Sequence, residues 1–176
     1  RGLVRKAKPN AGHDALAVFE QRLNDFTLIT QNVDGFHLEA SNENILEIHG
    51  NIMINLCFAD RSHDVSDPDM NSKPPKCPYC GAFIRPGVVW FGESLPHEVL
   101  DESWGKAEGA EVFLSVGTSS LVHPAASLPV VAKQAGAYLV EINPAETPLS
   151  SQADLVIRQS AAEALPEIVR KLEWQS

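Results

Sequence analysis

The second half of the chain alternates short apolar segments with amphipathic ones, and this alternation limits the possible folds more than any other feature. Residues 112–116, 137–142 and 155–158 are apolar runs of strand length. Residues 96–105 and 124–134 have the spacing of helices that bury one face. Strands that alternate with helices predict an α/β fold, built on a Rossmann-like parallel sheet with helices on both faces.

The first half carries a similar pattern. Asn10 is a suitable N-cap for a helix over residues 11–22, whose apolar side chains fall on one face. Residues 26–30 predict a buried strand, and residues 45–48 and 52–56 predict two short strands. A length of 176 residues suits one domain, or one domain with a small insertion.

The start of the last helix is open between two positions. Ser160 and Glu163 have the spacing of a capping box, which places the start directly after Ser160. Pro166 favours a later start near Leu165, because proline is best tolerated in the first turn of a helix.

Residues 59–76 differ from both halves, because they are polar, rich in proline and poor in apolar side chains. Such a segment predicts a protruding loop or a small module. We therefore divide the chain into a Rossmann-like body, residues 1–50 and 88–176, and a small module similar to a zinc ribbon, residues 51–87.

Three cysteines flank this polar segment. Cys77 and Cys80 form a Cys-x-x-Cys pair, and Cys57 lies upstream with Asp60 three residues after it. The spacing is typical of a zinc site with two knuckles, and a carboxylate can replace a thiolate as a ligand. Asp60 is the first candidate for the fourth ligand and His63 the second. The alternative is a module that has lost a ligand and binds zinc weakly or not at all.

Four polar loops follow predicted strands. In doubly wound sheets, ligands bind beyond the carboxyl ends of the strands. Each loop alone is common, since glycine, asparagine and aspartate also form ordinary turns and a single histidine is often structural. Together they predict a ligand site formed by residues 31–35, His49-Gly50, residues 117–120 and Asn143.

Six motifs occur in a fixed order along nearly the whole chain. They are Lys-Pro-Asn-Ala-Gly-His at 8–13, Thr-Gln-Asn-Val-Asp-Gly at 30–35, Ile-His-Gly at 48–50, Val-Val-Trp-Phe-Gly-Glu at 88–93, Gly-Thr-Ser at 117–119 and Glu-Ile-Asn at 141–143. By these motifs the chain resembles the sirtuins, which are NAD-dependent protein lysine deacylases. The residues of the fourth and fifth motifs are most similar to those of the bacterial and mitochondrial desuccinylase-like branch of the family.

The resemblance implies a reaction between an acylated lysine and NAD that gives free lysine, nicotinamide and O-acyl-ADP-ribose. It implies that His49 is the general base, which suits an imidazole because its ordinary pKa lies near neutral pH. The same resemblance assigns a cofactor-binding role to Gln31, Asn32, Asp34, Gly117, Thr118, Ser119 and Asn143. The first three would contact the nicotinamide half of NAD, and the others the adenosine half.

The resemblance also places the substrate. A peptide would add as a strand between Gly92-Glu93 and the segment after Ser120, where backbone pairing tolerates many sequences. Val89 and Phe91 would line the tunnel for the acylated lysine. For Trp90 and Phe91, ordinary core packing is the alternative.

The chain departs from the sirtuin pattern at two places. The family pattern opens with a strand, a Gly-Ala-Gly-x-Ser loop and a cofactor loop. This sequence contains none of the three. We therefore expect a longer parent protein, and slow or no turnover by this chain alone. The alternative is a non-catalytic remnant that binds peptide or zinc. The second departure is Asp60, which stands where a zinc cysteine is usual.

The net charge of −9 limits the partners. An acidic chain lacks the surplus of Lys and Arg that phosphate binding needs, so we expect no nucleic acid as a partner. The resemblance to the sirtuins implies acylated-lysine peptides as partners. No apolar run approaches the roughly 18 residues of a membrane span. Three cysteines cannot close a disulfide framework, which favours a reducing, cytoplasmic location. The sequence does not determine the oligomeric state.

Overall fold

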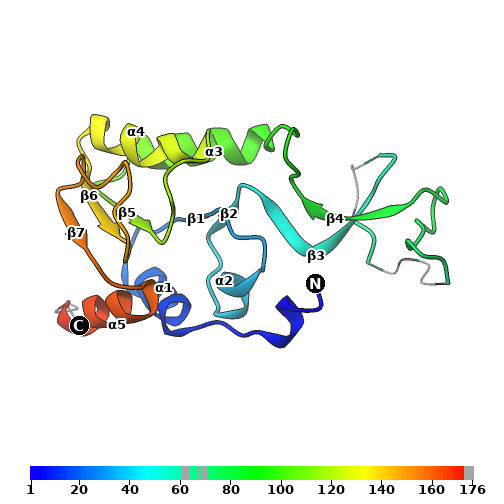
Figure 1. Cartoon of the computed structure of the whole chain (residues 1–176), viewed down its shortest axis with the longest axis horizontal. Coiled ribbons are helices and arrows are strands. Elements are labelled where there is room, and N and C mark those ends of the chain that lie inside the picture. Colours follow the sequence, from blue (N-terminus) through cyan, green and yellow to red (C-terminus); the bar gives the residue numbers. More distant parts are fainter. Residues whose placement is uncertain (61–63, 67, 69–70, 173–176) are drawn as a thin grey trace.

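The computed structural model describes residues 1–60, 64–66, 68 and 71–172, and it has the predicted α/β architecture (Figure 1). Strands β5 (Val112–Val116), β6 (Tyr138–Ile142) and β7 (Leu155–Ile157) form one parallel sheet in that order. Strands β1 (Leu28–Thr30) and β2 (Ile45–Glu47) form a second parallel sheet. The parallel strands therefore form two sheets and not one continuous sheet. Within the described residues, β1 pairs with β2 alone, and β5 pairs with β6 alone.

Helices cover both faces of the sheets, as predicted (Figure 1). Helices α3 (His97–Glu108) and α4 (Leu128–Ala135) pack together on one face. Helices α1 (Ala11–Arg22) and α5 (Ala161–Lys171) pack together on the other. None of the helices in the described ranges has both the length and the apolar character needed to cross a membrane. Three short helical elements complete this part of the chain: η1 (Val4–Lys6), α2 (Phe36–Glu39) and η2 (Ala125–Ser127).

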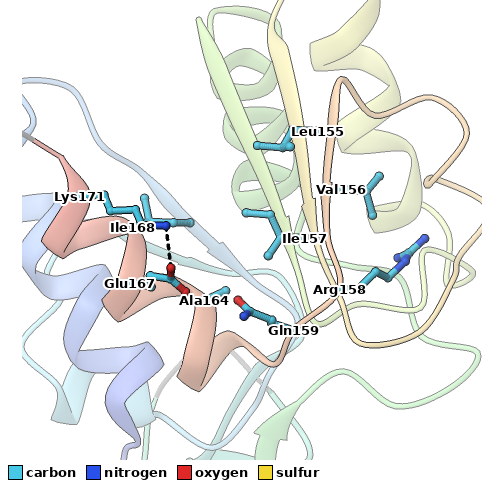
Figure 2. A pocket seen from close by; sticks show the side chains of 9 residues that line it. All are labelled: Leu155, Val156, Ile157, Arg158, Gln159, Ala164, Glu167, Ile168 and Lys171. Carbon is cyan, nitrogen blue, oxygen red and sulfur yellow. Dashed lines mark ion pairs between the residues drawn. The ribbon is translucent and has the colours of Figure 1, made fainter.

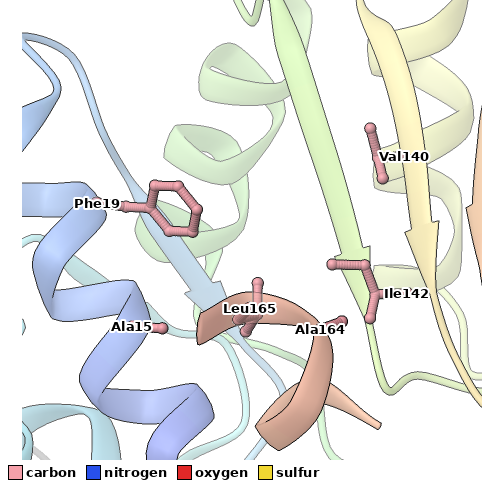
Figure 3. Packing of buried hydrophobic residues seen from close by; sticks show 6 residues of the cluster. All are labelled: Ala15, Phe19, Val140, Ile142, Ala164 and Leu165. Atoms are coloured by element: carbon pink, nitrogen blue, oxygen red, sulfur yellow. The ribbon is translucent and has the colours of Figure 1, made fainter. Parts of the chain in front are cut away.

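The body has a core on each face of its sheets. On one face, α1 and α5 bury side chains against β6 (Figure 3). The core there consists of Ala15, Phe19, Val140, Ile142, Ala164 and Leu165. On the other face, a second cluster joins α3 and α4 through Ala107, Leu128, Ala132 and Ala137. Burial of these apolar groups is the main source of stability for the body.

Helix α5 begins at the earlier of the two predicted positions. Ser160 is its N-cap, and Glu163 accepts hydrogen bonds from the Ser160 amide and hydroxyl at 3.2 and 2.6 Å. Pro166 therefore lies inside the helix. The later start, near Leu165, is wrong. A proline in the second turn costs the helix one backbone donor, whereas the capping box satisfies first-turn donors that have no other partner.

The small module is an antiparallel pair of strands, β3 (Gly50–Cys57) and β4 (Ile84–Val88), that extends away from the body (Figure 1). The two strands cross closely at the base of the module. Gly50 has a φ of +73°, and a Cβ there would lie 2.1 Å from the carbonyl oxygen of Gly87. Only glycine fits this crossing, which accounts for the His-Gly pair in the sequence. The boundaries of the module at residues 51 and 87 stay a prediction.

Candidate functional site

The loops at the carboxyl ends of the strands meet, although the two sheets do not pair. Gln31 follows β1, and its Nε2 donates to Oγ1 of Thr118, which lies just beyond β5, at 3.3 Å. Asn143 follows β6, and its Nδ2 donates to the carbonyl oxygen of Thr118 at 2.8 Å. Gly117 and Ser119 are exposed on either side of Thr118. Side-chain hydrogen bonds therefore connect the predicted nicotinamide and adenosine halves of the site.

His49 belongs to the same network. Its Nδ1 lies 3.0 Å from the carbonyl oxygen of Gln31. A carbonyl oxygen can only accept, so this contact places the ring proton on Nδ1 and leaves the Nε2 lone pair to take a proton. The half-buried His49 follows β2, and the tight crossing at Gly50 fixes the backbone next to it. The arrangement is that of an imidazole held ready to act as a base.

The loop after β1 holds two further predicted residues. Asp34 accepts a hydrogen bond from the Phe36 amide at 3.0 Å, which caps the short helix α2. The backbone amide of Asn32 donates to Oγ1 of Thr30 at 3.1 Å, and Asn32 itself is exposed. Burial raises the pKa of nearby Glu47, and the charge of Asp34 raises it further, while a hydrogen bond from Asn51 opposes both. The carboxyl groups of Asp34 and Glu47 are therefore close enough to interact.

The predicted substrate segment lies beside His49. The amide of Val89 donates to the carbonyl oxygen of His49 at 2.9 Å. Two residues further on, the side chain of Phe91 is fully exposed, with a relative accessibility of 102%, so the core-packing alternative for Phe91 is wrong. Gly92 follows in the left-handed region, with a φ of +87°. An apolar side chain and an exposed stretch of backbone are thus presented next to the base.

The three cysteines come together in the module. Cys57 lies at the end of β3, and Cys77 and Cys80 lie in a turn closed by the Gly81 amide, which donates to the Cys77 carbonyl at 2.9 Å. Their Sγ atoms all lie within 4.8 Å of one another. A tetrahedral zinc ion with Zn–S bonds of about 2.3 Å needs sulfur atoms about 3.8 Å apart. The three thiols therefore fit three corners of a zinc site.

The fourth corner stays a prediction. Asp60 is exposed, and among the described residues the group of converging ligand atoms consists of the three cysteines without it. His63, the second candidate, lies outside the described residues.

Two buried charged residues beside the site were not predicted. Arg85 in β4 is 4% exposed and Glu141 in β6 is 1% exposed. Burial alone would raise the pKa of Glu141, but hydrogen bonds from Ser150, Thr147 and Arg158 outweigh it and hold the pKa below its ordinary value. An ionisable residue within an apolar strand was the available signal, because a buried charge needs a partner.

A cavity of about 520 Å³ lies away from these loops, between β7 and α5 (Figure 2). Aliphatic side chains such as Ile157 and Ile168 line it together with an ion pair between Lys171 and Glu167 at 2.6 Å. None of the predicted site residues contributes to its lining. The candidate site therefore rests on the converging loops and not on this cavity.

Comparison with known proteins identifies relatives along the whole chain. Residues 1–124 match the profile of the Sir2 family. An NAD-dependent protein deacylase of Aquifex aeolicus is 44% identical over 170 residues, which are 96% of this chain and 71% of that protein. NAD-dependent protein deacylase 1 of Caldanaerobacter subterraneus is 44% identical over 93% of this chain and 68% of its own length.

Solved structures agree with the sequence relatives. The crystal structure of a Sir2 homologue in complex with NAD superimposes with a TM-score of 0.88 at 44% identity, and covers 95% of this chain and 66% of that one. A structure of Sir2 bound to acetylated peptide has a TM-score of 0.89 at 32% identity, and covers 96% of this chain and 73% of that one. The chain thus spans about two thirds to seven tenths of the length of these relatives.

Proposed function

The chain belongs to the Sir2 family, and from this premise we propose that it removes acyl groups from protein lysine side chains in an NAD-dependent reaction, with His49 as the general base. The relatives are named NAD-dependent protein deacylases, and one related structure holds an acetylated peptide. The observation that carries the proposal is the hydrogen-bonded series from His49 through Gln31 and Thr118 to Asn143.

This series would bind the two halves of NAD on either side of the base. Gln31, Asn32 and Asp34 would contact the nicotinamide riboside. Gly117, Thr118, Ser119 and Asn143 would contact the adenosine. NAD, when bound, supplies a ribose carbon that can accept the acyl oxygen and release nicotinamide. With water consumed, the products balance as free lysine, nicotinamide and O-acyl-ADP-ribose.

His49 would act on a hydroxyl group of that ribose. The Gln31 carbonyl oxygen holds the ring through Nδ1, so Nε2 is the nitrogen that can remove the hydroxyl proton. The ribose oxygen is then free to attack the acyl carbon. Val89 and Phe91 would surround the lysine stem and exclude water, and the backbone of Gly92 and Glu93 would pair with the peptide.

The zinc ion would have a structural role. Cys57, Cys77 and Cys80 would hold it, with Asp60 or His63 as the fourth ligand. A filled coordination shell leaves no open position for water or substrate, so the metal would stabilise the module and take no part in the reaction.

The partners and location follow from the same assignment. We expect basic, lysine-containing peptides to be attracted to a chain with a net charge of −9, and we expect neither nucleic acid nor membrane to bind. Thiols in place of disulfides at all three cysteines are in keeping with a cytoplasmic location.

Peptide-dependent nicotinamide release is the direct test. The purified chain is incubated with NAD and an acetyl-lysine peptide, and then with a succinyl-lysine peptide, and nicotinamide is measured by chromatography. We expect release that is slow in this chain alone, depends on the peptide and is lost in His49→Ala. The matched control is His97→Ala, which removes an exposed histidine at the start of α3. Peptide binding without any release would contradict the proposal and favour a non-catalytic peptide-binding remnant.

A further inference from the structure

Arg85 is a buried charged residue to which the proposed reaction gives no role. Its guanidinium donates through Nη1 and Nη2 to the two carboxylate oxygens of Glu93, at 2.6 and 2.9 Å. The two side chains are 4% and 22% exposed. A bidentate pair of this kind fixes both distance and orientation, because the planar guanidinium matches the carboxylate.

The same guanidinium reaches the rest of the loop between these two residues. Nη2 also donates to the carbonyl oxygen of Val88 at 2.8 Å. The guanidinium carbon lies 3.9 Å from the centre of the Trp90 ring, a cation–π contact. The Trp90 amide donates to Glu93 Oε2 at 3.1 Å, and the Glu93 amide donates back to the Trp90 carbonyl at 2.9 Å. One arginine therefore contacts the loop of residues 88–93 at three of its residues, Val88, Trp90 and Glu93.

This loop is the segment that carries Phe91 and is tied to the base. The Val89 amide donates to the carbonyl oxygen of His49, so the loop begins beside the backbone of the base. Phe91 then points fully into solvent, and makes no packing contribution that would hold it there. Trp90 and Glu93, which lie on either side of Phe91 in the sequence, both contact Arg85.

We propose that Arg85 is a positioning residue, which holds the Val88–Glu93 loop in the conformation that receives the acylated lysine beside His49. The inference rests on the proposed function, because it takes this loop as the place where the peptide binds. It changes the role of the Glu93 side chain, whose two carboxylate oxygens serve the loop through Arg85 and leave substrate contact to the backbone. A loop that is already ordered binds its peptide more tightly, because no conformational entropy has to be lost to order the loop on binding.

The test measures peptide and cofactor-side affinities separately. The probes are a fluorescein-labelled peptide with one central acetyl-lysine, followed by anisotropy, and ADP-ribose, followed by calorimetry. We expect Arg85→Met to weaken peptide binding by about tenfold or more, and to change ADP-ribose binding by less than about twofold. Arg85→Lys keeps the charge without the bidentate geometry, so its peptide affinity should lie between those of Arg85→Met and the unchanged chain.

Two further variants separate a positioning role from a general loss of structure. Glu93→Gln keeps the size of the side chain and breaks the bidentate pair, and it replaces Arg85→Met if that variant does not fold. Arg170→Met removes an exposed arginine on α5 and should bind peptide normally. Zinc content and the melting temperature are recorded for every variant. Hydrogen exchange of the Trp90 amide should accelerate in Arg85→Met and Glu93→Gln and stay unchanged in Arg170→Met.

The outcomes are distinct. The inference is supported if only peptide affinity is lost, with the highest affinity in the unchanged chain, a lower one in Arg85→Lys and the lowest in Arg85→Met. Peptide affinity that is equal in folded Arg85→Met or Glu93→Gln and in the unchanged chain overturns it and leaves the proposed function intact. Equal losses for peptide and ADP-ribose overturn it in favour of a general structural role. If the unchanged chain binds no acetylated peptide, the proposed function fails and the inference fails with it.

Discussion

The body and the small module are held together by different chemistry. Aliphatic and aromatic side chains make the two cores of the body, as in the contact of Phe19 and Leu165 with β6 (Figure 3). The buried cluster of the module is smaller, and two of its members, Cys57 and Cys77, are thiols that accompany Val65 and Ile84. The body can therefore bury enough apolar surface to be stable, whereas the module depends on what binds its sulfur atoms.

This difference explains why the site lies where it does. The base and the cofactor loops follow strands of the body, and the loop that carries Phe91 follows β4 of the module. Substrate and cofactor would thus be held by two parts whose stabilities have separate origins. A change that loosens the module should affect peptide binding before it affects the cofactor side, and this consequence can be tested.

Loss of the metal should have the largest effect and should be confined to the module. Zinc binding contributes on the order of 10 kcal/mol to the folding free energy of small zinc-dependent folds. Cys77→Ser, or treatment of the zinc-loaded chain with a chelator, should remove this contribution. We expect hydrogen exchange to accelerate across residues 50–88 while α1 and α5 keep their protection. Mass spectrometry of exchange, with metal content measured in parallel, checks this. Equal loss of protection in both parts would show that the comparison is wrong and that the chain unfolds as one unit.

Truncation in the body core should have the next largest effect and spare the metal. Leu165 is fully buried, so Leu165→Ala should lower the free energy of unfolding by about 3 kcal/mol through lost burial and the cavity that remains. Urea denaturation measures the loss. Leu172→Ala, which shortens a leucine 43% exposed just beyond the same helix, is the control and should change the free energy by less than about 0.5 kcal/mol. Zinc release from Leu165→Ala under native conditions would contradict the separation of the two parts.

Patterns in the sequence were sufficient for the body because they are local. The helix at Ala11–Arg22 and the strand at Val112–Val116 have the predicted bounds, since N-caps and apolar periodicity are features of neighbouring residues. The split into two sheets and the short helix α2 were not predicted. Strand pairing joins residues far apart in the sequence, and a single turn of helix has too little periodicity to detect.

The site shows the same limit. Ordered motifs were enough to name the loops, because the carboxyl ends of parallel strands meet at one edge. They could not reveal that Gln31 bonds to Thr118, 87 positions away, or that Arg85 and Glu141 hold the neighbouring loops. These contacts depend on side-chain directions that only the folded chain fixes.

A buried ion in the body tests whether apolar packing alone describes it. Glu141 accepts hydrogen bonds from Ser150 at 2.6 Å and from Arg158 at 3.1 Å, and also from Thr147. Burial would raise the pKa of Glu141, yet these bonds lower it below its ordinary value of 4.5. Because the pKa is lower in the folded state, the resulting stability is complete above pH 4.5 and is lost as the pH falls through the folded pKa.

Glu141→Gln should therefore lower the free energy of unfolding by about 2 kcal/mol at neutral pH. This decrease is smaller than the one expected for Leu165→Ala. The difference between Glu141→Gln and the unchanged chain should shrink as the pH falls below 4.5, because the carboxyl of the unchanged chain becomes protonated while the amide does not titrate. Urea denaturation over a series of acidic pH values measures both free energies. Glu146→Gln changes an exposed carboxyl in the loop that follows β6 and controls for net charge. A loss from Glu141→Gln that exceeds that from Leu165→Ala would mean that the body, like the module, depends chiefly on a polar centre.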